Sequence, residues 1–303
     1  MTDCTAAQQG TPVVSHIVDV QGIPMSALLA EAPHPRAVIV ALHGGAASSR
    51  YFDCPNEPRL SLLRTGAALG FTVLALDRPG YGSSAAHAEG LAPAARRVDL
   101  AYAAVDRLLQ HRPRGAGVFL MAHSIGCELA VRMAADERAT DLLGVELAGT
   151  GRQHSPTAAG ILEAWRRDPS PPRKSGLHDL LWQPDRLYPA EVVGGAAISA
   201  RGPAYEKAVV DRWAPHDFPE LAARVRIPVH FSLGDHEMIW LTGDCALADI
   251  AAMFTASSRV VVDEQAHGGH NLSLGLTAMA YHLKVLSFVE ECAVAAAQRQ
   301  LGR

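Results

Sequence analysis

Short apolar runs alternate along this chain with longer segments in which apolar residues recur at helical spacing. The runs lie at residues 37–42, 72–76, 118–122, 142–147, 229–233 and 259–262. Near-continuous apolar runs of this length are typical of parallel strands buried on both faces. Two earlier runs, 13–20 and 24–30, are joined across Gly22 and predict an antiparallel hairpin at the edge of the sheet.

Segments with helical spacing lie between the apolar runs, at residues 93–110, 125–135, 242–254 and 276–297. Strands that alternate with helices indicate a mostly parallel sheet with helices on both faces. We therefore predict an α/β protein built on an eight-stranded, mostly parallel sheet.

The alternation stops between residues 151 and 216. Prolines recur through this segment, and helical spacing survives only in short pieces around 161–167 and 204–213. Proline excludes long helices and central strands, while a structureless loop of this length is uncommon in a compact domain. We predict an inserted helical cap at 151–216, with residues 1–150 and 217–303 forming the core.

The composition is that of an ordinary globular protein, with 49% hydrophobic and 19% charged residues. A net charge of −4 gives no basic surface that would attract nucleic acid. The first residues lack the features of a secretion signal, and no apolar run is long enough to span a bilayer. Five cysteines without a CxxC pair favour a reducing compartment. We expect a cytoplasmic protein with neither nucleic acid nor membrane as a partner.

A serine stands where the run at 118–122 meets the helical segment at 125–135. Ala122, Ser124 and Gly126 fit the small-x-Ser-x-Gly pattern of a nucleophile elbow, whose tight turn needs small residues two positions before and after the serine. Such a hydroxyl stands exposed at the carboxyl end of the sheet, where open α/β sheets bind ligands. The alternative is a serine that only caps the helix, and the partners of Ser124 must decide between the two.

A serine nucleophile needs a base, a carboxylate that orients the base, and donors for the oxyanion. Two acids, Asp235 and Glu237, follow the run at 229–233. Two histidines, His267 and His270, follow the run at 259–262. This chain order of serine, acid and histidine is the one expected in a nucleophile-elbow enzyme.

The combination of motifs resembles the α/β-hydrolase superfamily. The resemblance rests on HGG at 43–45, DRPGYGSS at 77–84, the elbow, and the late acid and histidine. It implies that the amides of Gly45 and Ile125 form the oxyanion hole. It favours Glu237 over Asp235 as the acid and His270 over His267 as the base, with the losing acid stabilising its loop.

The same resemblance suggests where substrate binds. His43 and Gly44 would lie beside the reacting carbonyl. From the residues themselves, Trp165, Trp182, Tyr188 and Trp213 of the cap are candidates for lining an apolar substrate pocket. The alternative for these aromatic residues is that they hold a small, proline-rich cap together.

Two other motifs in the sequence lack the residues that their sites would need. Gly80, Tyr81 and Gly82 partly match a dinucleotide-binding turn, but Pro79 interrupts it and no acid follows at the required distance. His267 and His270 are spaced like metal ligands, but no third ligand accompanies them at a sensible spacing. We predict no metal and no cofactor.

The resulting functional prediction is a serine hydrolase that cleaves an ester or thioester of a small to medium apolar acyl group. A serine at the elbow argues against epoxide hydrolases and haloalkane dehalogenases, which share this fold but use aspartate. Three further enzymes would use the same residues: an acyltransferase, a thioesterase acting on a carrier-protein-tethered acyl chain, and a cyclase. A ligand-binding relative without turnover is the alternative from another class.

Overall fold

The computed structural model describes residues 11–55, 57–167 and 176–301. Its strands form one eight-stranded sheet in the order β1-β2-β4-β3-β5-β6-β7-β8. They span β1 Val14–Val20, β2 Ile23–Ala30, β3 Val38–Leu42, β4 Thr72–Leu76, β5 Val118–His123, β6 Leu142–Ala148, β7 Val229–Gly234 and β8 Val260–Gln265.

The sheet is parallel except at one edge. β1 and β2 pair antiparallel, and β2 also pairs antiparallel with β4. From β4 through β8 every pair is parallel, with Leu42 of β3 opposite Leu76 of β4 and Ala122 of β5. The predicted mostly parallel sheet and its edge hairpin are therefore confirmed. The register brings the carboxyl ends of the central strands to one rim.

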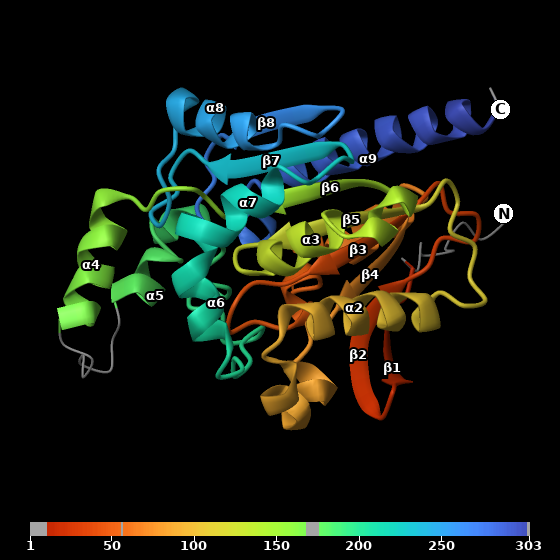
Figure 1. The fold of residues 1–303 in the computed structure, drawn as a ribbon, viewed down its shortest axis with the longest axis horizontal. Coiled ribbons are helices and arrows are strands. Elements are labelled where there is room, and N and C mark those ends of the chain that lie inside the picture. The colour runs from red at the N-terminus through yellow and green to blue at the C-terminus, as the bar shows by residue number, and fades with distance from the viewer. Residues whose placement is uncertain (1–10, 56, 168–175, 302–303) are drawn as a thin grey trace, which may run out of the picture.

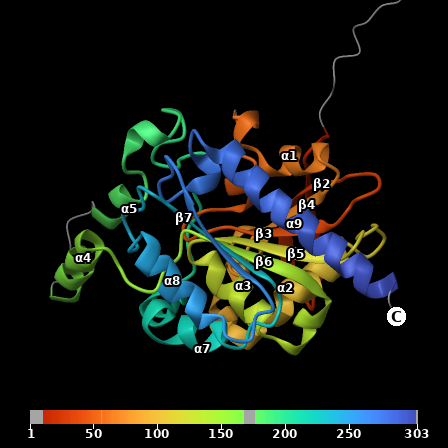
Figure 2. The same ribbon diagram turned by 90° about the horizontal axis from the view of Figure 1, so that it is seen from above.

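Helices cover both faces of the sheet because the side chains of the strands alternate between them. Val38, Val40 and Leu42 of β3 pack in the core under one set of helices, while Ile39 and Ala41 pack in the other. The first set is α2 Ala94–Leu108, α3 Gly126–Ala134, α7 Phe218–Ala222 and α8 Asp244–Met253. The second is α1 Leu62–Ala68 and α9 Ala278–Leu301. Figure 2 shows the two sets on opposite sides of the sheet.

α1 is a helix that the hydrophobic pattern does not predict. It is short, and Gly66 lies inside it, which disfavours a helix in isolation. Tertiary packing explains the glycine, because a Cβ there would lie 2.4 Å from the Cγ2 atom of Val73 in β4. A residue that weakens the helix is thus the one that lets it lie against the sheet.

Residues 149–228, which we call the β6–β7 segment, join β6 to β7 outside the sheet. They include α4 Pro156–Arg167, α5 Gly176–Leu180 and α6 Glu206–Arg212, and α4, α5 and α6 lie beyond the carboxyl ends of the strands (Figure 1). An isolated bridge pairs Ala47, after β3, with Ser199 of the segment. This segment contains the region in which we predict the cap.

Two observations bear on the expected environment. Within the described residues, no helix combines the length and apolar character needed to cross a membrane. The four cysteines of this part of the chain, at positions 54, 127, 245 and 292, are free. A cytoplasmic location stays a prediction.

Candidate active site

Ser124 occupies the turn between β5 and α3. Its φ of +52° is in the left-handed region, as expected for a side chain held out of a sharp turn. The glycine two positions later is required by the neighbouring strand, since a Cβ on Gly126 would lie 2.4 Å from the carbonyl oxygen of His43. The amide of Ser124 donates to the carbonyl of Ala148 at 2.8 Å, which ties the turn to β6.

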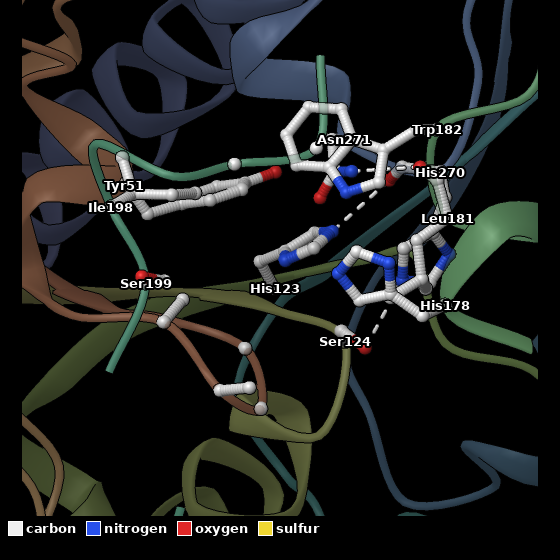
Figure 3. Close-up of a pocket in the computed structure, with 16 residues that line it drawn as sticks. Tyr51, His123, Ser124, His178, Leu181, Trp182, Ile198, Ser199, His270 and Asn271 are labelled. Carbon is white, nitrogen blue, oxygen red and sulfur yellow. Dashed lines mark hydrogen bonds between the residues drawn. The ribbon is translucent and has the colours of Figure 1, made fainter. Parts of the chain in front are cut away.

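His270 and Glu237 are aligned with Ser124 in a hydrogen-bonded series. The Nε2 atom of His270 lies 3.1 Å from Oγ of Ser124 (Figure 3). Its Nδ1 atom lies 2.8 Å from Oε2 of Glu237. Glu237 follows β7, and its Oε1 also accepts from the amide of Ile239 at 2.8 Å. The side chains of His270 and Glu237 are 2% and 0% exposed, so water does not compete for this contact.

Asp235 and His267, the alternative acid and base, have different neighbours. The carboxylate of Asp235 accepts from the backbone amides of His267 and Gly268, each at 3.0 Å. His267 is exposed and has a φ of +54°. Asp235 therefore fixes the loop that leads from β8 to His270, while Glu237 is the acid that reaches the His270 imidazole.

The turn after β3 lies against the serine from the other side. A Cβ on Gly44 would lie 3.1 Å from Cβ of Ser124, and one on Gly45 would lie 3.2 Å from Cγ2 of Ile125. Ile125 immediately precedes α3, where backbone amides are free of helical partners. Among the described residues, neither the Gly45 nor the Ile125 amide has a backbone or side-chain acceptor.

Two cavities meet at Ser124. One of about 80 Å³ is lined by Tyr51, His123 and Ile198 (Figure 3). The other, of about 330 Å³, is mostly apolar in its lining. Its walls come from α4, α6 and the loop after β7 and include Leu162, Val210, Trp213, Ile239 and Trp240. Residues shared by both cavities are Gly45, Ala46, Ser124, His178, Leu181 and His270.

Some of the residues predicted to contact substrate line a cavity, and others are buried behind the cavity wall. Gly44 and Trp182 line the smaller cavity. His43 is fully buried with its ring 4.8 Å from that of Tyr81, so the predicted contact of His43 with substrate needs correction. Tyr188 needs the same correction, because its buried hydroxyl accepts from the amide of Asn271 and supports the wall from behind. The side chain of Trp165 lies outside the described residues.

Several lining residues carry no signal in the sequence. His178 and Leu181 line both cavities, and Trp240 lines the larger one. They come from α5, the turn after it and the loop after β7, where no motif constrains them. Trp240 uses its indole nitrogen to donate to the carbonyl of Gly149 at 3.1 Å, which fixes the orientation of its ring.

His123, beside the serine, is a neutral buried group. Its ring stacks on Tyr51 with centroids 4.4 Å apart, and its Nε2 lies 3.0 Å from the carbonyl oxygen of His270. Burial, aided by the nearby His270, lowers the pKa of His123 well below its ordinary value. A neutral imidazole that donates from Nε2 thus holds the backbone of His270 in place.

The potential metal ligands in the described residues lie beside these loops. Asp235, His236 and His267 each offer a ligand atom, and these atoms lie within 4.8 Å of one another. This group does not include His270, so it differs from the His267–His270 pair considered in the sequence, and the absence of a metal stays a prediction. Both oxygens of Asp235 already accept backbone amides, so the cluster has a structural explanation without an ion.

Comparison with known proteins identifies the family. The family model described as "Alpha/beta hydrolase family" matches residues 39–279, and the chain belongs to this family. None of the curated proteins matches the sequence.

Solved structures share the fold at low sequence identity. A thermostable carboxyl esterase from Bacillus coagulans aligns with a TM-score of 0.67 and 17% identity, covering 92% of this chain and 99% of the esterase. The thioesterase domain from the curacin biosynthetic pathway aligns at 0.58 and 17%, covering 92% and 99%. An epoxide hydrolase from Vigna radiata aligns at 0.54 and 18%, covering 92% and 98%. The fold therefore accommodates different chemistries, and function must be argued from the site.

Proposed function

We propose that this protein is a serine hydrolase that cleaves an ester or thioester of a small to medium apolar acyl group through an acyl-enzyme. The observation that carries the proposal is the buried series from Glu237 through His270 to Ser124, which opens onto two cavities. Nucleophile, base and orienting acid in hydrogen-bond contact are what acyl transfer by serine requires.

The proton path follows from the two contacts of His270. Its Nε2 atom accepts the proton from Oγ of Ser124 as the oxygen attacks the substrate carbonyl. Glu237, at Nδ1, fixes the tautomer and stabilises the imidazolium that forms. His270 then protonates the leaving alcohol or thiol, and the same base activates the water that releases the acid.

The amides of Gly45 and Ile125 are the proposed oxyanion donors. They flank Ser124, and the described residues offer neither of them another acceptor. Backbone donors fixed before the reaction stabilise the tetrahedral oxyanion without reorganising, and one such donor is worth about a hundred- to thousandfold in rate. The expected negative charge also falls at the amino end of α3, where the helix dipole favours it.

The larger cavity supports an apolar acyl group of limited size. Its volume of about 330 Å³ lies at the lower end of small-molecule pockets, which span about 300–1,000 Å³. Leu162, Val210 and Trp213 present apolar surface there. Such a wall binds hydrocarbon, and the carboxylate of Glu206, which also lines the cavity, is already paired with Arg78.

Covalent labelling tests the proposal directly. A fluorophosphonate is expected to label Ser124, as located by peptide mapping, and p-nitrophenyl esters of two to twelve carbons should be hydrolysed with a preference for the shorter half. Ser124→Ala should lose the label and about a millionfold in kcat. Label on another residue, or turnover retained in Ser124→Ala, would refute the mechanism. Binding of esters by the wild type without label or turnover would favour a non-catalytic relative.

Transfer to an acceptor other than water is the second candidate function. The observation that favours it is the presence of two cavities at Ser124, since one can hold the acyl chain while the other admits an alcohol, an amine or a carrier-protein arm. Product analysis with competing alcohols and amines, and with acyl chains tethered to a carrier protein, separates this candidate from hydrolysis. Acid as the sole product in every mixture would exclude transfer.

A further inference from the structure

The carbonyl of Gly44, which belongs to the same peptide unit as the Gly45 amide, is held by two donors. Nη2 of Arg78 donates to this oxygen at 3.0 Å, and Nδ1 of His43 lies 2.8 Å from it. Nε2 of His43 accepts from the Arg78 amide at 3.1 Å, so the ring proton is on Nδ1, where it is donated to Gly44. Burial and the neighbouring Arg78 lower the pKa of His43, which keeps the ring in this neutral form.

Fixing this carbonyl fixes the amide of Gly45. In a trans peptide the C=O of one residue and the N–H of the next point in opposite directions within one plane. With the carbonyl directed at Arg78 and His43, the N–H is directed away from them. A hydrogen bond from a charged donor also polarises the peptide and makes its N–H a stronger donor.

Arg78 is in turn held by the β6–β7 segment. Its guanidinium is 4% exposed and donates to Oε2 of Glu206, the first residue of α6, at 2.7 Å. Tyr81 donates to the other oxygen of Glu206 at 2.6 Å, and its hydroxyl accepts from the amide of Ala46 at 3.1 Å. Arg78, Tyr81 and Glu206, which we call the Arg78 cluster, therefore join the turn after β3 to α6.

Side chains pack closely against Gly44 and Gly45 in the turn after β3. A Cβ on Gly45 would lie 2.9 Å from Oε1 of Glu206, and one on Gly44 would lie 2.9 Å from Nδ1 of His123. If Glu206 moved, Arg78 would lose its carboxylate partner, and the turn at Gly45 would lose the side chain packed against it.

We infer that Arg78 is a positioning residue that sets the direction and polarity of the Gly45 amide, and that Glu206 makes this setting depend on the β6–β7 segment. The inference rests on the proposed function, in which the Gly45 amide binds the oxyanion. It predicts that damage to the Arg78 cluster impairs the transition state more than substrate binding, because the oxyanion exists only after Ser124 attacks.

The test compares Arg78→Met, Arg78→Lys and Glu206→Gln with Asp211→Asn, a control on the exposed side of α6, where Asp211 pairs with Lys207. Hydrolysis of p-nitrophenyl butyrate is measured per serine titrated by fluorophosphonate, so that misfolded molecules do not count. Binding of 1,1,1-trifluorohexan-2-one, which forms a tetrahedral adduct with the serine, reports the oxyanion site.

Arg78→Met should lower kcat about 10- to 100-fold, less than the loss of a whole oxyanion donor, with KM within about threefold of the wild-type value. Affinity for the trifluoromethyl ketone should fall by the same factor as kcat. Arg78→Lys should recover part of the loss, Glu206→Gln should show a smaller loss of the same kind, and Asp211→Asn should match the wild type.

Equal kcat per titrated serine in the wild type and Arg78→Met would overturn the role of Arg78. If Arg78→Met does not fold, Arg78→Lys takes its place under the same criterion. Equal values in Glu206→Gln and Asp211→Asn would overturn the dependence on the segment. These results differ from failure of the proposed function, in which the wild type itself is neither labelled at Ser124 nor active.

Discussion

The core and the β6–β7 segment contribute to the candidate active site in different ways. The core supplies Ser124, Glu237 and His270 from loops that follow β5, β7 and β8 of one sheet, and parallel pairing from β5 through β8 brings these loops to one rim. The segment supplies most of the wall of the larger cavity from short helices, with Glu206 as a polar link to the core. The candidate catalytic groups are thus placed by the sheet, and the space around them is set by the segment.

The difference matters for which substitutions can be tolerated. A loop at the end of a buried strand has little freedom, because the strand register fixes where it starts. A surface helix that lines a cavity can exchange apolar side chains while its packing is preserved. We therefore expect changes in the core loops to alter rate and changes in the segment to alter the range of substrates.

The largest expected effect separates the two acids of the loop after β7. Glu237→Gln should lower kcat about 10⁴-fold, because the amide neither selects the reactive tautomer of His270 nor stabilises its charge. Asp235→Asn is the matched control and should stay within about tenfold of the wild type, since it changes only the support of the His267 and Gly268 amides. Steady-state kinetics on p-nitrophenyl butyrate measure both; the opposite ranking would assign the acid to Asp235.

The next effect concerns stability where the end of the segment meets the core. Arg97 of α2 and Glu128 of α3 are both 3% exposed and pair at 2.7 Å, and Glu128 also pairs with Arg132, which contacts Asp217. Glu128→Gln leaves buried arginine charge unpaired and should reduce the free energy of unfolding by about 3–5 kcal/mol.

Urea denaturation measures this loss. The control is Asp99→Asn, because Asp99 pairs with Arg138 at the surface with both side chains about half exposed. Exposed pairs contribute about 0–1 kcal/mol, so Asp99→Asn should differ little from the wild type. A similar loss of unfolding free energy in both variants would show that the buried pair contributes no more to stability than the exposed pair.

A smaller effect tests the segment as the determinant of acyl size. Val210 of α6 lines the larger cavity and is 44% exposed, so Val210→Trp should fill space there without disturbing the core. We expect the ratio of kcat/KM for eight-carbon over two-carbon p-nitrophenyl esters to fall about tenfold, within the range of one hydrophobic pocket contact. Val193→Trp, at an exposed position of the segment outside the cavity lining, is the control. An unchanged ratio in Val210→Trp would place the acyl chain elsewhere.

The smallest effect is a pH dependence of stability inside the core. Burial disfavours a charged His230 and by itself would lower its pKa. The Glu146 carboxylate, 2.5 Å from Nδ1 of His230, outweighs burial and raises the pKa of His230 above its ordinary value of 6.5. Asp263 also raises this pKa, and Lys284 opposes the rise. Since the folded state holds this proton more tightly, the resulting stability is present below about pH 6.5 and is lost as the pH rises through the folded pKa.

Unfolding free energies from pH 6 to 8 test this expectation. The wild type should lose stability relative to His230→Gln across this range, whereas exposed His111→Gln should follow the wild type. Parallel curves for the wild type and His230→Gln would contradict the raised pKa.

The sequence by itself determined the class of fold and narrowed the candidates for the reacting groups to one serine, two acids and two histidines. Buried strands are mostly apolar, so their positions could be read from the sequence. The predicted runs differ from the observed strands by at most a few residues at their ends. Gly126 must be small because the carbonyl oxygens of Leu42 and His43 lie against it, so this part of the elbow pattern could also be read from the sequence. Both constraints leave a local pattern in the sequence, either an apolar run or small residues at fixed spacing around Ser124.

Only the tertiary structure decided which groups touch. Glu237 and Asp235 are two residues apart and chemically alike, and their roles differ because one faces His270 and the other faces two backbone amides. The walls from α4, α5 and α6, the fully buried position of His43 and the link from Glu206 to Arg78 likewise arise from contacts between segments far apart in the chain. No local pattern encodes such contacts, because they depend on how whole elements pack.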